Sequence, residues 1–99
     1  MELNGAAAIV TGGASGIGRA TAKRLSTDGV KVLVVDLDLA GAQDVANEVG
    51  GAAFGADVSD PAATDAAFEK CVDTFGKVDI AFLNAGIAIG ISNLENLND

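Results

Sequence analysis

The sequence predicts an α/β fold, a parallel sheet whose strands alternate with helices. Through the first 86 residues, short apolar runs alternate with segments of helical periodicity. A glycine-rich segment directly follows the first apolar run, at the point where a strand would turn into a helix. Together these patterns predict the order β-α-β-α-β-α-β, with right-handed crossovers between the strands.

The first two strands are expected at Ala7–Val10 and Val32–Val35, with a helix between them. Val32–Val35 consists of four consecutive branched aliphatic residues, which is typical of a strand buried on both faces. Gly29 marks the end of the helix because glycine adopts the left-handed conformation easily. The small and apolar face of this helix consists of Gly18, Thr21, Ala22 and Leu25.

Two further helices and two strands follow. Ala52–Phe54 and Ile80–Leu83 are expected as the third and fourth strands. Gly50-Gly51 and Gly76 mark the ends of the helices, and Ser59-Asp60-Pro61 is typical of the start of the later one. The apolar faces are Leu39, Ala42, Val45, Ala46 and Val49 in the earlier helix, and Ala63, Ala67, Phe68, Cys71, Val72 and Phe75 in the later one.

This order of elements predicts the first half of a doubly wound, Rossmann-type parallel sheet with the strand order 3-2-1-4. Residues 1–99 are interpreted as a single incomplete domain, with its core at 1–86 and a polar loop or tail at 87–99. In that order the fourth strand is an edge, and an uncovered apolar edge invites pairing with another chain. We therefore expect self-association through the fourth strand.

Composition and charge narrow the class of protein. The formal net charge is −8, which argues against binding to nucleic acid or to an anionic membrane surface. The chain has one cysteine and no histidine, so an internal disulfide and a histidine-based triad or metal site are excluded. Cys71 lies on an apolar helix face and is interpreted as a core residue. With no basic leader and no apolar run of membrane length, a cytoplasmic protein is expected.

The glycine-rich segment Thr11–Gly18 is the first candidate binding motif. Its sequence fits the pattern T-G-x-x-x-G-x-G, although it lacks the third glycine of the general dinucleotide fingerprint G-x-G-x-x-G. Glycines here allow a sharp turn, a close approach of a diphosphate to the backbone, and close packing of the helix on the sheet. The alternative is a tight turn that binds nothing.

Asp36 is the second candidate, at the end of the second strand. It lies 18 residues beyond Gly18, close to the spacing expected for a carboxylate that binds an adenosine ribose. A 2′-phosphate beside this carboxylate would be repelled: two like unit charges ~4 Å apart cost about 4 kcal/mol at an effective dielectric near 20. The sequence therefore favours NAD over NADP. The alternative is a solvated loop aspartate.

Two further motifs follow the third and fourth strands. Asp57 and Val58 could contact an adenine. The aspartate would accept a hydrogen bond from the amino group of the adenine, and the valine would pack on the adenine ring. Alone, this pair fits an ordinary loop aspartate before a helix cap better than it fits an adenine site. The segment after the fourth strand would let the backbone run beside a ribose, although alone it fits a simple turn; it consists of Asn84, Ala85 and Gly86.

These four motifs, in this order and at these strand ends, resemble the classical short-chain dehydrogenase/reductase family from about Asn4 to about Gly90. The resemblance implies an oxidoreductase that uses NAD. It implies a diphosphate site at Gly12, Ser15, Gly16, Ile17 and Gly18. It also implies that Asp36 binds the adenosine ribose, that Asp57 and Val58 bind the adenine, and that the segment after the fourth strand lies near the second ribose.

The chain departs from the family at the catalytic positions. The family uses a Ser, further on a Tyr-x-x-x-Lys pair, and an Asn on the next helix, whereas this sequence has no Tyr and its last lysine, Lys77, precedes the fourth strand. Ser92 lies too early to match the catalytic Ser, so no catalytic residue is assigned. Two hypotheses stay open. In the first, the chain is the cofactor-binding portion of an enzyme that transfers hydride between NAD and an alcohol or ketone, and this transfer needs residues beyond Asp99. In the second, the chain is a truncated, non-catalytic module that binds a dinucleotide or serves as a scaffold.

Overall fold

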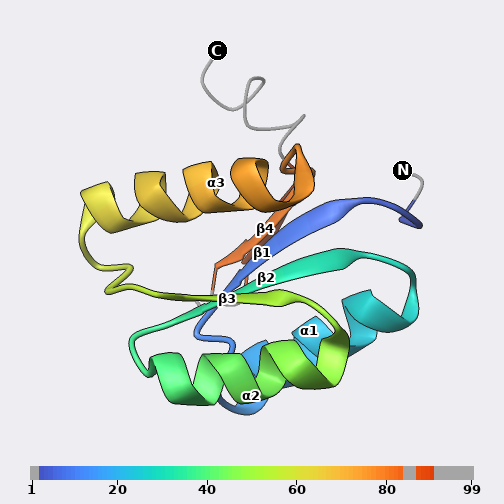
Figure 1. Ribbon diagram of the computed structural model, residues 1–99, viewed down its shortest axis with the longest axis horizontal. Helices are drawn as coiled ribbons and strands as arrows, with labels where there is room; N and C mark the ends of the chain where they lie inside the picture. Colours follow the sequence, from blue (N-terminus) through green and yellow to red (C-terminus); the bar gives the residue numbers. More distant parts are fainter. Residues whose placement is uncertain (1–2, 84–86, 91–99) are drawn as a thin grey trace.

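A computed structural model describes residues 3–83 and 87–90, and it consists of one sheet with helices on both faces (Figure 1). The elements in chain order are β1 (Ala7–Thr11), α1 (Gly16–Thr27), β2 (Lys31–Asp36), α2 (Leu39–Val49), β3 (Ala52–Gly55), α3 (Pro61–Phe75), β4 (Ile80–Leu83) and β5 (Ile87–Gly90). The helices α1 and α2 cover one face of the sheet, and α3 covers the other (Figure 1). Among the described residues, no helix is long and apolar enough to cross a membrane.

The sheet has the order β3-β2-β1-β4-β5, and its first four strands are parallel. This confirms the predicted order 3-2-1-4. In the centre of the sheet, Ile9 of β1 pairs with Leu33 of β2 on one side and with Ala81 of β4 on the other. The helices lie on both faces of the sheet because the crossovers are right-handed and the chain reverses its direction across the sheet. It moves one way from β1 to β3 and then returns to β4 on the other side of β1.

The strand β5 corrects two predictions. It pairs antiparallel with β4, with Leu83 opposite Ile87 and Ile80 opposite Gly90. The sequence had predicted a loop at 87–90 and an unpaired edge at the fourth strand, and both expectations were wrong. The physical reason is that the edge of β4 presents unpaired N–H and C=O groups, and the nearest apolar stretch of the same chain satisfies them. Self-association through the β4 edge therefore loses its basis.

The core consists of two layers that lie on opposite faces of the sheet. Along β2, Val32 and Val34 face α1 and α2, whereas Leu33 and Val35 face α3. All four side chains are at most 1% exposed. The alternation explains why this strand is apolar at every position, since each face of a doubly covered sheet must be buried.

The single cysteine belongs to the layer beneath α3. Cys71 is fully buried among Ile9, Leu33 and Ala67, and its thiol lies 3.4 Å from the carbonyl oxygen of Lys77. Burial raises the pKa of the Cys71 thiol to about 11. The prediction of a core residue is confirmed, because a thiol that stays protonated and covered is a poor nucleophile.

Side chains at the helix starts satisfy the free backbone donors there. The Asp60 carboxylate accepts a hydrogen bond from the N–H of Ala62, next to Pro61 at the first position of α3. In the same way, the Asp38 carboxylate accepts one from the N–H of Gly41 at the start of α2. Such caps contribute about 1 kcal/mol each. The predicted start of the later helix is thus confirmed at Asp60.

Two residues that the helical periodicity placed on apolar faces are exposed. Leu39 is 52% exposed and Val72 is 48% exposed. Leu39 is the first residue of α2 and sits at the edge of the layer, and Val72 is rotated by about 100° from the buried neighbour Cys71. A periodic stripe that is broader than the buried contact line accounts for both differences.

Asp79 joins the starts of β1 and β4, and this contact predicts how stability depends on pH. Its carboxylate accepts a hydrogen bond of 2.9 Å from the N–H of Ala7 and lies 3.1 Å from Nζ of Lys77. The Ala7 hydrogen bond, followed by the Lys77 contact, holds the pKa of Asp79 below its ordinary value. A lowered pKa means that this stabilisation is complete above about pH 4–5 and is lost as the pH falls through the folded-state value.

We therefore expect the free energy of unfolding to fall as the pH is lowered from 5 towards 2, and the variant Asp79→Asn to flatten this acid limb. Urea titrations at a series of pH values measure the effect. Asp73→Asn removes a charge from the exposed surface of α3 and serves as the control. An acid limb that is equally steep in the Asp79→Asn protein would contradict the assignment.

Candidate functional site

The carboxyl ends of β1 and β2 meet beneath the glycine-rich segment, here called the glycine loop and defined as residues 11–18. Thr11 ends β1, is buried, and donates a hydrogen bond to the carbonyl oxygen of Phe82 on β4 at 3.4 Å. The N–H of Gly13 donates to the carbonyl oxygen of Val35 on β2 at 3.2 Å. The loop is therefore fixed to three neighbouring strands at the edge of the sheet formed by their carboxyl ends.

Gly12 and Gly18 are among the glycines that the geometry of the loop requires. Gly12 has a φ of 63°, which a residue with a side chain adopts only with strain. A Cβ on Gly18 would lie 2.2 Å from the carbonyl oxygen of Gly12. The first turn of α1 can contact the loop backbone only because Gly18 has no side chain, as the sequence predicted for close packing of the helix.

The start of α1 presents free backbone donors. Ser15 is the N-cap, and its side chain makes no capping hydrogen bond. The N–H groups of the first turn, including those of Gly16, Ile17 and Gly18, have no partner within the helix. Ile17 is 66% exposed, so this end of α1 faces solvent. Free donors together with the positive end of the helix dipole are features that could hold an anion.

Asp36 lies beside the loop, and both of its carboxylate oxygens are held by backbone donors. Oδ2 accepts a hydrogen bond of 3.0 Å from the N–H of Ala14, and Oδ1 accepts one of 2.9 Å from the N–H of Asp38. An ionised carboxylate has about four acceptor positions. Asp36 is half-buried, so it is oriented by the loop and retains capacity to accept hydrogen bonds from a hydroxyl group.

Asp57 and Val58 lie just beyond the carboxyl end of β3. Oδ1 of Asp57 accepts hydrogen bonds from the N–H of Ser59 at 3.0 Å and from its Oγ at 2.6 Å. These hydrogen bonds lower the pKa of the Asp57 carboxyl, so it is an anion at neutral pH. Val58 is 43% exposed. The local turn thus uses one oxygen of Asp57, while an apolar side chain stands in solvent next to it.

The structure brings most of the predicted site residues to one edge. The glycine loop, Asp36 and Asp57–Val58 follow β1, β2 and β3, whose carboxyl ends share that edge because the strands are parallel. The predicted ribose segment lies outside the described residues; it comprises Asn84, Ala85 and Gly86. Sequence reasoning missed Ala14 and Asp38, whose contributions come from backbone N–H groups that no residue type signals.

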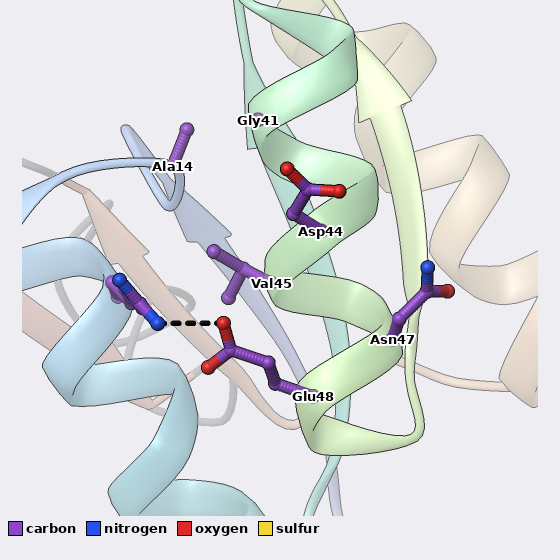
Figure 2. A pocket seen from close by; sticks show the side chains of 7 residues that line it. Ala14, Gly41, Asp44, Val45, Asn47 and Glu48 are labelled. Carbon is purple, nitrogen blue, oxygen red and sulfur yellow. Dashed lines mark hydrogen bonds and ion pairs between the residues drawn. The ribbon is translucent and has the colours of Figure 1, made fainter.

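Arg19 and Lys23 are two basic residues of α1 that follow the glycine loop. Both form ion pairs with Glu48 of α2, with N–O distances of 2.6 Å from Arg19 and 3.0 Å from Lys23. The hydrogen bonds from these two side chains lower the pKa of the Glu48 carboxyl. In Figure 2 Glu48 extends from α2, and the dashed line marks its ion pair with Arg19. In this structure the two cations link α1 to α2.

A hollow of about 470 Å³ lies between the glycine loop, α1 and α2 (Figure 2). Its lining residues come from all three segments: Ala14, Arg19, Gly41, Asp44, Val45, Asn47 and Glu48. Because the N–H of Ala14 is bonded to Asp36, the hollow shares a wall with the candidate ribose site.

Comparison with curated proteins finds dehydrogenases among the relatives of this chain. The chain is 41% identical over 102 residues to the cyclohexanol dehydrogenase of Acinetobacter sp. (strain SE19), covering 98% of this chain and 41% of the relative. It is 41% identical over 93 residues to the D-threitol dehydrogenase of Mycolicibacterium smegmatis, covering 89% of this chain and 36% of that protein. The chain therefore spans about two fifths of the length of these curated relatives.

A solved structure with the same fold is 3-ketoacyl-(acyl-carrier-protein) reductase from Brucella melitensis, crystallised with NADH. It superimposes with a TM-score of 0.76 at 47% sequence identity, over 80% of this chain and 33% of that one. The family model described as short chain dehydrogenase matches residues 6–99. With nearly the whole chain matched, and with its glycine loop, parallel sheet and strand order in place, the protein belongs to the short-chain dehydrogenase family.

Proposed function

We propose that this chain is the NAD-binding portion of an oxidoreductase, and that the complete enzyme transfers hydride between NAD and an alcohol or ketone. The observation that carries this proposal is the placement of the Asp36 carboxylate, which is held by the N–H of Ala14 beside the free donors of α1. One end of the site suits an anionic diphosphate, and the other suits the hydroxyl groups of a ribose. Relatives named as dehydrogenases, and a neighbour that contains NADH, support it.

Each group of residues has a separate role in this proposal. The diphosphate is held by Gly12, Ser15, Gly16, Ile17 and Gly18. Asp36 accepts hydrogen bonds from the adenosine ribose. The exposed side chain of Val58 packs on the adenine, and the oxygen of Asp57 that the local turn does not use accepts from its amino group. Asn84, Ala85 and Gly86 run beside the second ribose.

The cofactor preference in this proposal is NAD over NADP. Asp36 carries a negative charge at the ribose position, and a 2′-phosphate there would place like charges side by side. Leu37 and Ser15 provide no compensating positive charge. Arg19 and Lys23 are paired with Glu48, so neither cation offsets the negative charge of Asp36 near the ribose.

The bound cofactor would supply or accept the hydride, and this chain would bind and orient it. The chain contains no Tyr, and in the proposed enzyme the proton transfer to substrate oxygen falls to residues beyond Asp99. The buried Cys71, with its raised pKa, takes no part in the reaction.

Calorimetric titration with NAD and with NADP tests the proposal, using the unmodified protein and the variant Asp36→Ala. The unmodified protein is expected to bind NAD at least tenfold more tightly than NADP. In Asp36→Ala, loss of hydrogen bonds to a charged group, worth about 1.5–3 kcal/mol, weakens NAD binding by about tenfold or more. Affinity for NADP rises as the repulsion is removed, and the two affinities converge.

Asp65→Asn is the control for charge, because it removes an exposed carboxylate from α3 and leaves the glycine loop unchanged. It should preserve the preference for NAD. Equal affinities of the unmodified protein for NAD and NADP would refute the role of Asp36, and binding of neither would refute the proposed function itself.

A further inference from the structure

Gly41 occupies a crowded position in the first turn of α2. A Cβ built on it would lie 2.5 Å from Oδ2 of Asp38 and 3.0 Å from Cβ of Ala14. Both distances are shorter than ordinary contacts between atoms of these kinds. Figure 2 shows Ala14 and Gly41 at the same end of the hollow, one on the glycine loop and one on α2.

Backbone conformation does not account for a glycine at this position. Gly41 is not one of the glycines with a positive φ, so an alanine could adopt its backbone conformation. Alanine is also the better residue inside a helix, because glycine gains more freedom on unfolding. The feature that favours glycine here is the close approach of Ala14 and of the Asp38 carboxylate, which leaves little room for a Cβ at position 41.

The same residues form a closed set of contacts around Asp36, which we call the carboxylate clasp and define as Ala14, Asp36, Asp38 and Gly41. The N–H of Gly41 donates to Oδ1 of Asp38 at 3.1 Å. The N–H of Asp38 donates to Oδ1 of Asp36 at 2.9 Å, and the N–H of Ala14 donates to Oδ2 of Asp36 at 3.0 Å. The two donors that fix Asp36 therefore come from the two segments that meet at Gly41.

We propose that Gly41 is a positioning residue that determines cofactor specificity through the carboxylate clasp. This inference rests on the proposed function, in which Asp36 binds the adenosine ribose. A methyl group at position 41 pushes the Asp38 carboxylate and Ala14 away from α2. The two N–H donors then move relative to Asp36, and its carboxylate loses the fixed orientation with which it meets the ribose hydroxyls and repels a 2′-phosphate.

The test is calorimetric titration of Gly41→Ala with NAD and with NADP. We expect NAD to bind about threefold to tenfold more weakly, since a charged hydrogen-bonding group is no longer held in place. NADP binding should change less, because reduced repulsion offsets the lost contacts. The ratio of the two affinities therefore falls by about threefold or more.

The matched control is Ala40→Gly, one position earlier on the exposed side of the same turn. It weakens the helix by intrinsic propensity and lies outside the clasp, so the affinity ratio should stay unchanged. Ala14→Val provides a second variant, because it fills the same gap from the loop side without altering α2. It is expected to lower the ratio in the same direction as Gly41→Ala.

Amide NMR spectra of the ligand-free proteins add a readout that does not depend on binding. The signals of Ala14 and Asp38 report the two hydrogen bonds to Asp36, and they should shift in Gly41→Ala and remain in place in Ala40→Gly. Selective NAD binding by the unmodified protein, with an unchanged ratio in Gly41→Ala and Ala14→Val, would overturn this inference alone. Absence of NAD and NADP binding in the unmodified protein would overturn the proposed function and this inference together.

Discussion

Replacing Gly18 by alanine is expected to abolish measurable NAD binding and to lower the free energy of unfolding by about 2–3 kcal/mol. The added Cβ would lie 2.2 Å from the carbonyl oxygen of Gly12, 2.7 Å from its carbonyl carbon and 2.9 Å from Cα of Gly13. All three atoms belong to the backbone, so no side-chain rotation can relieve the overlap. Overpacking of this kind costs about 1–3 kcal/mol or more.

The functional loss in Gly18→Ala should exceed the loss of stability. Relief of the overlap requires α1 to move away from the glycine loop, and the free N–H groups of the first turn move with it. An anion site depends on the convergence of these donors, so a displacement of α1 removes it while the rest of the sheet stays folded. Urea titration and calorimetry with NAD measure the two effects separately.

Gly16→Ala is the comparison variant for this prediction. Gly16 has a φ of 42° and no atom within 4 Å of the position of an added Cβ. Its substitution therefore tests backbone strain without overlap, at a cost of about 1–2 kcal/mol. A Gly18→Ala protein that is as stable as the unmodified chain and binds NAD equally well would show that α1 and the loop are not packed as described.

Leu33→Ala is expected to destabilise the whole sheet by about 3 kcal/mol, within the range measured for buried Leu-to-Ala changes. Leu33 is fully buried in β2, with Ile9 of β1 on one side and Ala52 of β3 on the other. It lies in the same apolar layer as Cys71 beneath α3. Because the net stability of a small domain is only about 5–15 kcal/mol, this one substitution removes a large part of it.

The rate of alkylation of Cys71 under native conditions measures this loss. The thiol is buried, and its pKa is raised to about 11, so it reacts only when the layer beneath α3 opens. Where closing is faster than reaction, the rate follows the population of the open form. A loss of 3 kcal/mol then corresponds to an increase of about a hundredfold.

Leu39→Ala is the control for the Leu33 prediction, since it removes the same atoms from a side chain that is 52% exposed. Its labelling rate should rise by less than about fivefold. Equal rates in the two variants would mean that the alkylation of Cys71 does not depend on the packing of β2.

The parallel sheet could be predicted because each of its elements carries a local signal. The continuous apolar run of β2 and the cap at Asp60 act over a few residues, and the glycine loop has its own spacing. What escaped prediction depends on the partner that a segment meets in the fold. Residues 87–90 form the strand β5 because the edge of β4 offers them a partner. The periodicity of these four residues does not predict that pairing.

The residue types of the candidate site could be predicted from the sequence, whereas the contacts between them could not. Asp36 and the glycine loop were identified by spacing, whereas the hydrogen bonds that orient Asp36 come from the backbone of Ala14 and Asp38. A backbone N–H is present at every residue except proline, so sequence does not distinguish the donors that matter. The same holds for Gly41. In the sequence it is only a residue of low helix propensity, and its close contacts with Ala14 and Asp38 are seen only in the structure.

The pairing of Arg19 and Lys23 with Glu48 also affects how fast an anionic dinucleotide can arrive. With these cations neutralised by an acidic partner, the chain's net charge of −8 opposes the approach of such a ligand at long range. Capture therefore depends on the short-range donors at the start of α1. Added salt should accelerate association by screening the repulsion over about 10 Å at 0.1 M ionic strength, which is the reverse of electrostatic steering.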